Sequence, residues 1–220
     1  SVSDMNVWVN LYGSNAFDSA VPGAGRVKLT QDTDYPWDGR IKISVQSAGD
    51  FTLNLRIPAW AEGASVRVDG QAGPAARPGA YAAVARTWKP GDSVELTLPM
   101  EVRLVEANPK AEELRNQVAV MRGPVLYALE SPDLPAGVRI SEVALPLDIK
   151  FTPRHDAQLL RGVTVLEGQA VRFREGSWTG ALYRTVKKAA PEKINVKLIP
   201  YYAWDNRGIP YMTVWMPLVR

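Results

Sequence analysis

The stretch "DTDYPWDG", residues 32–39, gathers three carboxylates and two large aromatic side chains within eight positions. The carboxylates of Asp32, Asp34 and Asp38 could supply oxygen ligands to calcium, although their spacing does not match the calcium loop of an EF-hand. The rings of Tyr35 and Trp37 could stack on the apolar face of a sugar. Calcium binding and sugar stacking are therefore the two functional interpretations of this stretch.

The same residues also fit a turn between two strands. They separate "RVKLTQ" from the strictly alternating "RIKISVQ". Pro36 to Gly39 suits a type I turn in which Gly39 has a positive φ and forms a bulge. We favour this hairpin, with its aromatic side chains covering a neighbouring domain, over sugar stacking, and sugar stacking over calcium.

The other aromatic residues divide into core candidates and surface candidates. A tryptophan in or beside an alternating strand is more often part of the core than a ligand platform, as at Trp60, Trp88 and Trp215. The segment "PYYAWDNRGIPY", residues 200–211, instead clusters three rings ahead of a turn, which suits an interface or a carbohydrate groove. We expect an interface there. The candidates for contact with a domain or a glycan are Tyr35, Trp37, Trp60, Tyr201, Tyr202 and Trp204.

Few side chains could build a catalytic centre from this chain alone. It contains no cysteine, which excludes disulfides and thiolate nucleophiles, and a zinc site would need mostly carboxylates. The lone His155 is expected in a surface loop, pointing away from Asp156. "PGAGRV", residues 22–27, lacks the third glycine of a dinucleotide loop. A carboxylate pair for glycoside cleavage stays open, because the fold brings such pairs together.

Composition and charge exclude several classes of partner. Apolar residues make up 46% and charged residues 22% of the chain, which indicates a globular protein. The net charge of +3 is too small and scattered for a nucleic-acid binder, and we interpret its densest basic run, "YRTVKK" at 183–188, as a solvated strand face. No apolar run approaches the ~18 residues of a membrane helix. We expect neither nucleic acid nor membrane as a partner.

The first residues, "SVSDMNVWVN", show no initiator methionine and no signal-peptide h-region. They lead almost directly into an expected strand, so the sequence looks like a piece of a longer chain. Its compartment stays open between the bacterial cytoplasm and the periplasm, because a cysteine-free domain fits both.

Alternation of apolar and polar residues dominates the pattern. It is clearest in "RIKISVQ" (40–46), "FTLNLRI" (51–57) and "SVELTLPMEVRL" (93–104). A period of two with one apolar face is typical of antiparallel strands covered on one side. Asp69-Gly70 suits a tight hairpin, and Pro90-Gly91 suits a type II turn. These signals predict an all-β fold built as a β-sandwich.

Only "ANPKAEELRNQ", residues 107–117, is predicted to be helical. Asn108 is a plausible N-cap and Pro109 a first helical residue. Because the segment is short and polar, we expect one or two turns of helix linking two sheets. The regular alternation also ends here, so we place a domain boundary near residue 106.

Seven blocks of the sequence, in this order, resemble the carboxyl-terminal region of glycoside hydrolase family 127-like proteins, the bacterial β-L-arabinofuranosidases. They span nearly all of the chain, and "TDYPWDG" and "VMRGP" are their more specific parts. The blocks are "VWVNLYGSNAF", "VKLTQDTDYPWDGRIKISV", "FTLNLRIPAW", "ASVRVDGQ", "WKPGDSVELTLPMEVRLVEANPK", "QVAVMRGPVLYALE" and "LIPYYAWDNRG".

The resemblance implies that the chemistry lies elsewhere. Family members are expected to have an upstream (α/α)6 helical barrel, in which a zinc-bound cysteine acts as the nucleophile, followed by two β-sandwiches. This chain has no cysteine, so no catalytic residue of the family can be placed on it, and zinc is expected only in the barrel. Where the family often has a cysteine after the tyrosine of "GPLVY", this chain has Ala128, an expected core position.

The resemblance also implies a domain arrangement. Two antiparallel β-sandwiches of jelly-roll or immunoglobulin-like type are expected, with little helix. The first would contain residues 1–105 plus 208–220. The second, residues 106–207, would be inserted before the final strand of the first.

These observations lead to one hypothesis and two rivals. The leading hypothesis is a non-catalytic part of a glycoside hydrolase that supports the helical barrel of the same polypeptide and contributes a homodimer surface. The first rival is a module that binds arabinose-containing plant glycans through its aromatic side chains. The second is an enzyme with a carboxylate pair inside these sheets.

Overall fold

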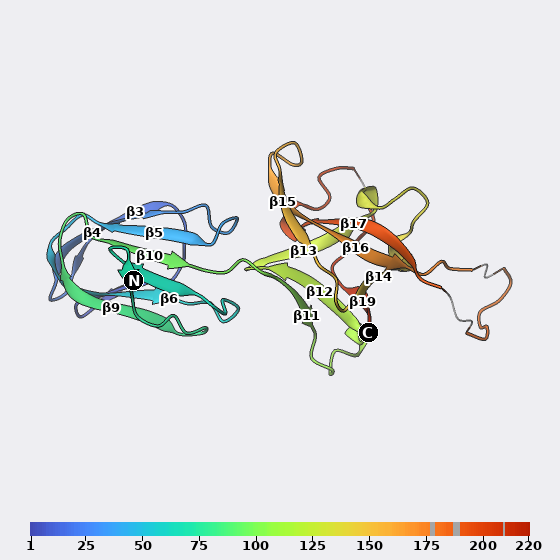
Figure 1. Ribbon diagram of the computed structural model, residues 1–220, viewed down its shortest axis with the longest axis horizontal. Coiled ribbons are helices and arrows are strands. Elements are labelled where there is room, and N and C mark those ends of the chain that lie inside the picture. The colour runs from blue at the N-terminus through green and yellow to red at the C-terminus, as the bar shows by residue number, and fades with distance from the viewer. Residues whose placement is uncertain (177–178, 187–189, 209) are drawn as a thin grey trace. The chain divides into compact units, whose positions relative to one another are not determined.

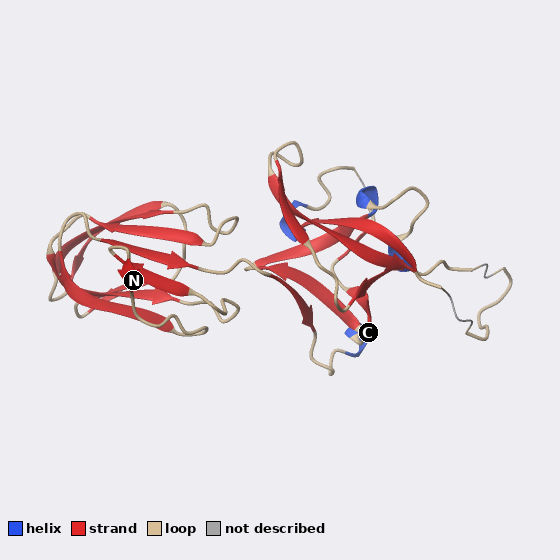
Figure 2. Ribbon diagram, viewed as in Figure 1, coloured by secondary structure: helices blue, strands red, loops and turns tan. Residues whose placement is uncertain are grey.

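The computed structural model describes residues 1–176, 179–186, 190–208 and 210–220. Strands dominate it, and its few helical segments are single short 3₁₀ turns (Figure 2). The prediction of an all-β chain is therefore confirmed. The chain divides into two compact units, unit 1 at Ser1–Glu101 and unit 2 at Val102–Arg220. No helix in the described ranges is long and apolar enough to cross a membrane.

Unit 1 contains two sheets. One has the strand order β1-β2-β6-β9 and the other β3-β4-β5-β10-β7-β8. Their bounds are β1 (Val2–Ser3), β2 (Asn6–Val9), β3 (Asn15–Val21), β4 (Gly25–Asp32), β5 (Arg40–Val45), β6 (Gly49–Arg56), β7 (Ser65–Val68), β8 (Gln71–Ala72), β9 (Tyr81–Trp88) and β10 (Ser93–Thr97).

The predicted alternation builds a single core shared by these two sheets. Ile41, Ile43 and Val45 of β5 are each 1% exposed, and Leu53 and Leu55 of β6 are fully buried. Figure 1 shows β3 and β5 on one side of this core and β6 and β9 on the other. Because one side chain in two is apolar along these strands, each sheet buries one face against the other.

The expectation that all strands run antiparallel is wrong at β2–β6, which pair in parallel. In this pair Asn54, placed by its spacing on the outer face of β6, is only 5% exposed. Its amide Nδ2 donates a hydrogen bond of 3.0 Å to Oδ1 of Asn6 on the neighbouring strand. The hydrogen bond offsets the cost of burying the amide, which spacing alone could not reveal.

Two turns lie where the sequence places them. Asp69 and Gly70 have φ values of 49° and 77° and join β7 to β8, as expected of a two-residue hairpin. Gly91 has a φ of 100°, and the Asp92 N–H donates to the Lys89 carbonyl at 3.1 Å. This second turn links β9 and β10, which belong to different sheets, so it passes the chain over the core.

The turn at residues 32–39 differs from the expected one. Its hydrogen bond runs from the Trp37 N–H to the Asp34 carbonyl at 2.8 Å, and the Tyr35–Pro36 peptide bond is cis. Gly39 is not among the glycines with a positive φ. The prediction that it has a positive φ and forms a bulge is therefore wrong. A Cβ built on Gly39 would lie 1.8 Å from the Leu98 carbonyl oxygen, whereas the Leu98 N–H donates to the Gly39 carbonyl at 2.8 Å. A glycine is required at position 39 because the backbone of Leu98 lies too close to leave room for a side chain.

Unit 2 contains one nine-stranded sheet and four 3₁₀ turns among its described residues. The strands are β11 (Val102–Glu106), β12 (Gln117–Arg122), β13 (Val125–Glu130), β14 (Val143–Pro146), β15 (Thr152–Asp156), β16 (Val163–Arg172), β17 (Glu192–Pro200), β18 (Met212–Thr213) and β19 (Met216–Val219). The turns are η1 (Glu112–Leu114), η2 (Ser131–Asp133), η3 (Ile140–Glu142) and η4 (Tyr201–Ala203).

Six strands of unit 2 pair in a closed ring, in the order β12-β19-β14-β16-β17-β13 and back to β12. A closed barrel therefore stands where the second antiparallel sandwich was expected. All of its pairs are antiparallel except β14–β19, which is parallel. The buried side chains inside include Tyr127, Leu145 and Leu198. Closure removes the free edges that an open sheet would leave.

Two expected boundaries are wrong. Residues 208–220 were expected to return to the first sandwich, but β19 pairs with β12 and β14 of unit 2. Residues 102–105 were also expected in the first sandwich, but β11 pairs along β12. The pattern "SVELTLPMEVRL" therefore spans two strands in different units, separated by the non-strand residues 98–101. The sequence patterns of β11 and β19 do not indicate which strands they pair with.

Three local predictions in unit 2 also differ. The expected helix at 107–117 is reduced to the single turn η1, with the Asn108 side chain accepting the Lys110 N–H at 3.0 Å. His155 is exposed as expected, but it lies in strand β15 and not in a loop. The run "YRTVKK" was predicted to be the face of a strand, but residues 183–186 are exposed and form no strand. Lys187 and Lys188 lie outside the described residues.

Glu142 is a buried carboxylate that ties η3 to the strands around it. It accepts the Arg139 N–H at 3.2 Å, the Glu175 N–H at 3.1 Å and the Arg172 guanidinium at 2.7 Å. These bonds, led by the one from the Arg139 backbone and opposed by desolvation, lower the pKa of Glu142 to about 2. They stabilise the ionised carboxylate.

We predict that Gly39→Ala destabilises unit 1 by about 2 kcal/mol or more, because the new Cβ displaces the Leu98 backbone. Urea unfolding followed by tryptophan fluorescence measures the loss. Gly13→Ala is the matched control, since a Cβ added at Gly13 would meet no atom within 4 Å. Equal stabilities of the two variants would contradict this account of Gly39.

We predict that unit 2 loses stability as the pH falls from about 4.5 toward about 2, because Glu142 has a lower pKa folded than unfolded. The folded state binds the proton less readily, so its contribution is present above the unfolded pKa and is lost on acidification. Denaturant unfolding across this pH range checks the slope. Glu142→Gln should flatten it, and an unchanged slope would contradict the assignment.

Candidate functional site

The first aromatic group lies at the end of unit 1 where β2 and β6 end and β9 begins. The Tyr12 hydroxyl donates to the Arg56 carbonyl at 2.6 Å, and the Tyr81 hydroxyl donates to Oδ1 of Asn10 at 2.6 Å. The ring of Tyr12 meets that of Tyr35 edge to face, with centroids 6.0 Å apart. These contacts fix the orientation of rings that come from three different loops and strands.

The electrostatics of this group favour recognition over acid–base chemistry. Burial raises the pKa of Tyr12 and of Tyr35, so both phenols stay protonated at neutral pH. The guanidinium of Arg56 is exposed and has no carboxylate partner within ion-pair distance among the described residues. Rings, hydroxyls and a cation can bind the face of a ring or an anionic group, but they supply no nucleophile with its base.

The candidate site residues of unit 1 differ in their burial and in their partners. Tyr35 and Trp60 are partly buried and pack against the core. Trp37 is 38% exposed. Asp38 binds a neighbouring arginine: it accepts the Arg40 N–H at 2.8 Å and forms an ion pair of 2.8 Å with the Arg40 guanidinium. No group of three or more acidic, histidine or cysteine side chains in the described ranges could hold a metal ion.

The second aromatic group is the loop at residues 200–208 of unit 2, called here the aromatic loop. Tyr201 stacks on Trp204 with centroids 6.5 Å apart, and Tyr202 is 59% exposed. Trp204 packs against a small core that contains Val163 and Ile199. Trp204 therefore anchors the loop, while Tyr201 and Tyr202 present polar-tipped rings to the surface. The predicted aromatic residues thus fall into two groups in separate units.

A buried ionic cluster holds the aromatic loop. The guanidinium of Arg207 pairs with Glu130, which is fully buried, and with Asp133. Asp133 also pairs with Lys197 at 2.7 Å. The second oxygen of Glu130 accepts the Asp205 N–H at 2.9 Å. The hydrogen bond to Asp133, and secondarily that to Glu130, raises the pKa of Arg207.

Sequence reasoning missed this cluster and the partners of Tyr35. Glu130 and Arg207 are 77 positions apart, and Tyr12 lies in a different loop from Tyr35. One signal was present: Glu130 ends the apolar run "VLYAL" at a strand position where a charge needs a partner. The sequence contains no information that identifies Arg207 as that partner.

We predict that Arg207→Met destabilises unit 2 by roughly 3–5 kcal/mol, because it leaves the buried Glu130 carboxylate without its cation. Urea unfolding of unit 2 measures the loss. Arg154→Met is the matched control in the same unit, because the ion pair of Arg154 with Glu167 is solvent-exposed and is expected to contribute at most about 1 kcal/mol. Similar losses in both variants would contradict the role of the cluster.

Comparisons with known proteins fit this division into two units. The family model described as "Beta-L-arabinofuranosidase, GH127 middle domain" matches residues 6–100. The model of the glycoside hydrolase family 127 C-terminal domain matches residues 102–217. Their shared limit falls where unit 1 ends and unit 2 begins.

Individual relatives agree. The non-reducing end β-L-arabinofuranosidase of Bifidobacterium longum subsp. longum is 33% identical over 204 residues, which cover 87% of this chain and 30% of the relative. A solved structure described as a glycoside hydrolase is 44% identical with a TM-score of 0.90, covering 97% of this chain and 36% of its own.

The crystal structure of a GH127 β-L-arabinofuranosidase from Geobacillus stearothermophilus T6 is 37% identical with a TM-score of 0.89, over 98% of this chain and 34% of its own. The chain thus spans about a third of the length of the relatives it matches. One family model matches more than half of its residues and another most of the remainder, and the chain therefore belongs to glycoside hydrolase family 127.

Proposed function

We propose that this chain is the non-catalytic, all-β part of a β-L-arabinofuranosidase-like enzyme. In this proposal unit 1 is the β-sandwich that the sequence suggested, unit 2 is a barrel, and bond cleavage takes place in an (α/α)6 barrel of the same polypeptide. Support comes from the names of the matching family models, a middle and a C-terminal domain.

The state of the buried carboxylates is the observation that carries the proposal. A glycosidase needs one carboxyl group with a raised pKa to protonate the leaving group and a second that stays ionised. Here Glu130 and Glu142 are buried, but each is paired with an arginine. Glu142 has a lowered pKa, so it is an acceptor of hydrogen bonds and not a proton donor. Both carboxylates hold loops and strands in place.

The donor set of this chain does not suit the zinc that the family resemblance implies. Thiolates are absent, a single histidine is present, and the described residues offer no cluster of three ligating side chains. Any zinc of the whole enzyme would be held by residues outside these 220. The exposed rings at Trp37, Tyr201 and Tyr202 supply apolar surface for a neighbouring domain or a second copy of the chain.

We predict that the purified 220-residue chain does not hydrolyse an aryl β-L-arabinofuranoside. Release of the aryl alcohol, followed by absorbance, measures turnover, and the heat-denatured chain provides the blank. Turnover that co-purifies with the folded chain, and that is lost when one of its carboxylates is substituted, would overturn the proposal.

A second candidate function is recognition of arabinose-containing glycans. The observation that favours it is the exposed Arg56 beside the rings of Tyr12 and Tyr81, whose types suit a sugar face with an anionic or hydroxyl group. Calorimetry with arabinose-containing oligosaccharides tests it. Binding that is lost in Arg56→Ala, but kept in the surface control Arg26→Ala, would establish this function. Absence of binding would favour the supporting role.

A further inference from the structure

Strand β9 forms one border of the sheet β1-β2-β6-β9 in unit 1, where it lies beside β6 (Figure 1). It is eight residues long, and its other edge pairs with no strand in the part of the chain that the structure describes. An edge strand presents backbone N–H and C=O groups without partners in their own sheet, so a further strand can add there. The open edge of β9 is therefore a candidate docking surface.

The alternation of backbone groups shows which residues of β9 face the open edge. The Ile57 N–H donates to the Ala80 carbonyl at 2.8 Å, just before β9 begins. In an antiparallel pair, residues that bond to the neighbouring strand alternate with residues that do not. Because the Ala80 carbonyl points to β6, the even-numbered residues of β9 bond to β6. The residues whose N–H and C=O groups point to the open edge are Tyr81, Ala83, Ala85 and Thr87.

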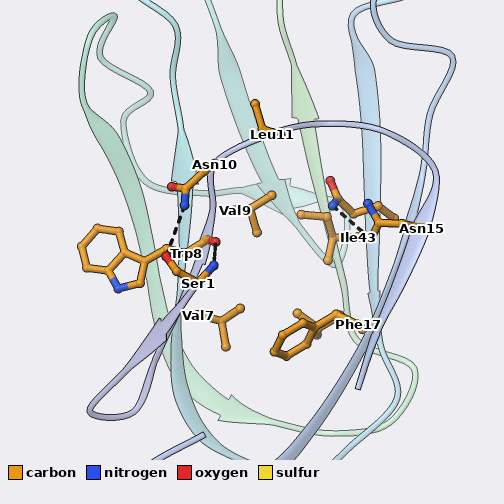
Figure 3. Close-up of a pocket in the computed structure, with 11 residues that line it drawn as sticks. Ser1, Val7, Trp8, Val9, Asn10, Leu11, Asn15, Phe17 and Ile43 are labelled. Atoms are coloured by element: carbon orange, nitrogen blue, oxygen red, sulfur yellow. Dashed lines mark hydrogen bonds between the residues drawn. The ribbon is translucent and has the colours of Figure 1, made fainter. Parts of the chain in front are cut away.

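Two of the other edges in unit 1 are too short to invite a partner. Both β1 and β8, at the borders of their sheets, have two residues. Figure 3 shows the β1 side, where Ser1 is held to the next strand: its amino group donates to the Trp8 carbonyl at 3.1 Å, and its hydroxyl accepts from Asn10 at 3.2 Å. Very short edge strands are one device by which proteins avoid unwanted pairing.

The remaining edge strand, β3, is long but carries a charge. Asp18 lies at the middle of its seven residues, is exposed, and pairs with Arg26 at 2.6 Å. A charge on an edge strand is a second protective device. On β9 the exposed side chains that alternate with the core residues are uncharged over the whole strand: Tyr81, Ala83, Ala85 and Thr87. Of the two long edges in unit 1, β9 is thus the unprotected one.

The charged residue of β9 does not guard this edge either. Arg86 lies opposite Phe51, on the face of β9 that Val84 shares. Its guanidinium pairs with Asp69 at 2.6 Å and lies over the ring of Trp88, 5.2 Å from the centroid. Contacts within unit 1 therefore hold the cation away from the open edge.

A second copy of β9 fits this edge because the strand is complementary to itself. About a twofold axis at Val84, Ala83 lies opposite Ala85 of the second copy, and Tyr81 lies opposite Thr87. Each residue that faces the edge then meets one that also faces it, so the two can exchange hydrogen bonds. No like charges meet in this register, whereas a register centred on Arg86 would bring two guanidinium groups together.

We propose that unit 1 forms a homodimer through β9. The β9 strands of two copies pair antiparallel about Val84 and join two four-stranded sheets into one. The inference goes beyond the proposed support and glycan functions, because it uses the backbone of β9 and neither the exposed rings nor Arg56. Association is measured without turnover, so its outcome is separate from that of the activity test.

Sedimentation velocity of the 220-residue chain over a wide range of concentrations tests the proposal, and a monomer–dimer equilibrium is expected. The double variant Ala83→Lys with Ala85→Lys sets lysine opposite lysine on both sides of the axis, and should weaken dimerisation about tenfold or more. The matched control is Ala16→Lys with Ala20→Lys, which adds the same charges at exposed positions of the other long edge strand, β3. It should keep the dimer.

Mixing provides a test of the register. A chain with Ala83→Glu and Ala85→Glu should be as weakly dimeric as the lysine chain, but an equal mixture of the two should form a heterodimer, because each lysine then lies opposite a glutamate. If the charged variants do not fold, amide hydrogen exchange of the unsubstituted chain decides. The Ala83 and Ala85 amides should become protected as the concentration rises.

Four results would each overturn the proposal. The first is a chain that stays monomeric up to millimolar concentration. The second is a dimer that survives the lysines at Ala83 and Ala85, which would place the interface on another surface such as the aromatic loop. The third is an equal loss of dimer in the β3 control, or no heterodimer in the mixture. The last is a dimer in which the Ala83 and Ala85 amides exchange as fast as in the monomer.

Discussion

Every long strand of this protein has to keep one of its faces away from water, and this constraint decides both architectures. In unit 1 the inward side chains of β5 and β6 meet across a single core, so two sheets cover one another. In unit 2 the pairing of β12 with β13 closes six strands into a ring, and the ring encloses its own core. Alternation of apolar side chains is common to both solutions, and it does not distinguish them.

The buried charges follow from the same constraint. Once strands are covered, a carboxylate at a strand end such as Glu130 can persist only with a cation and a backbone donor at hand. Arg207 and Asp205 provide these, and the aromatic loop is thereby fixed to β13. Glu142 does the same for η3 and β16 through Arg172. The two most deeply buried carboxylates, Glu130 and Glu142, therefore hold loops and strands in place. This is consistent with the proposed supporting role.

Prediction from the sequence succeeded where the cause is local. The alternation around Ile43 and Leu53, and the turn at Asp69-Gly70, depend on neighbours within a few residues, and the structure has them as expected. It failed where the cause lies far along the chain. Gly39 is explained by the backbone of Leu98, and β19 by its pairing with β12 and β14. Of the candidate residues, spacing alone could place Trp37 at the surface, but not the contact of Tyr35 with Tyr12.

The position of β19 has a consequence for how the protein is made. Unit 1 consists of one continuous segment, so all of its strands are available once residue 101 has been synthesised. The ring of unit 2 lacks a member until residues 216–219 emerge, since β19 stands between β12 and β14. Until then β12 and β14 expose unpaired edges, the kind of surface on which newly made chains aggregate. The topology therefore allows unit 1 to fold before the last strand of unit 2 has been made.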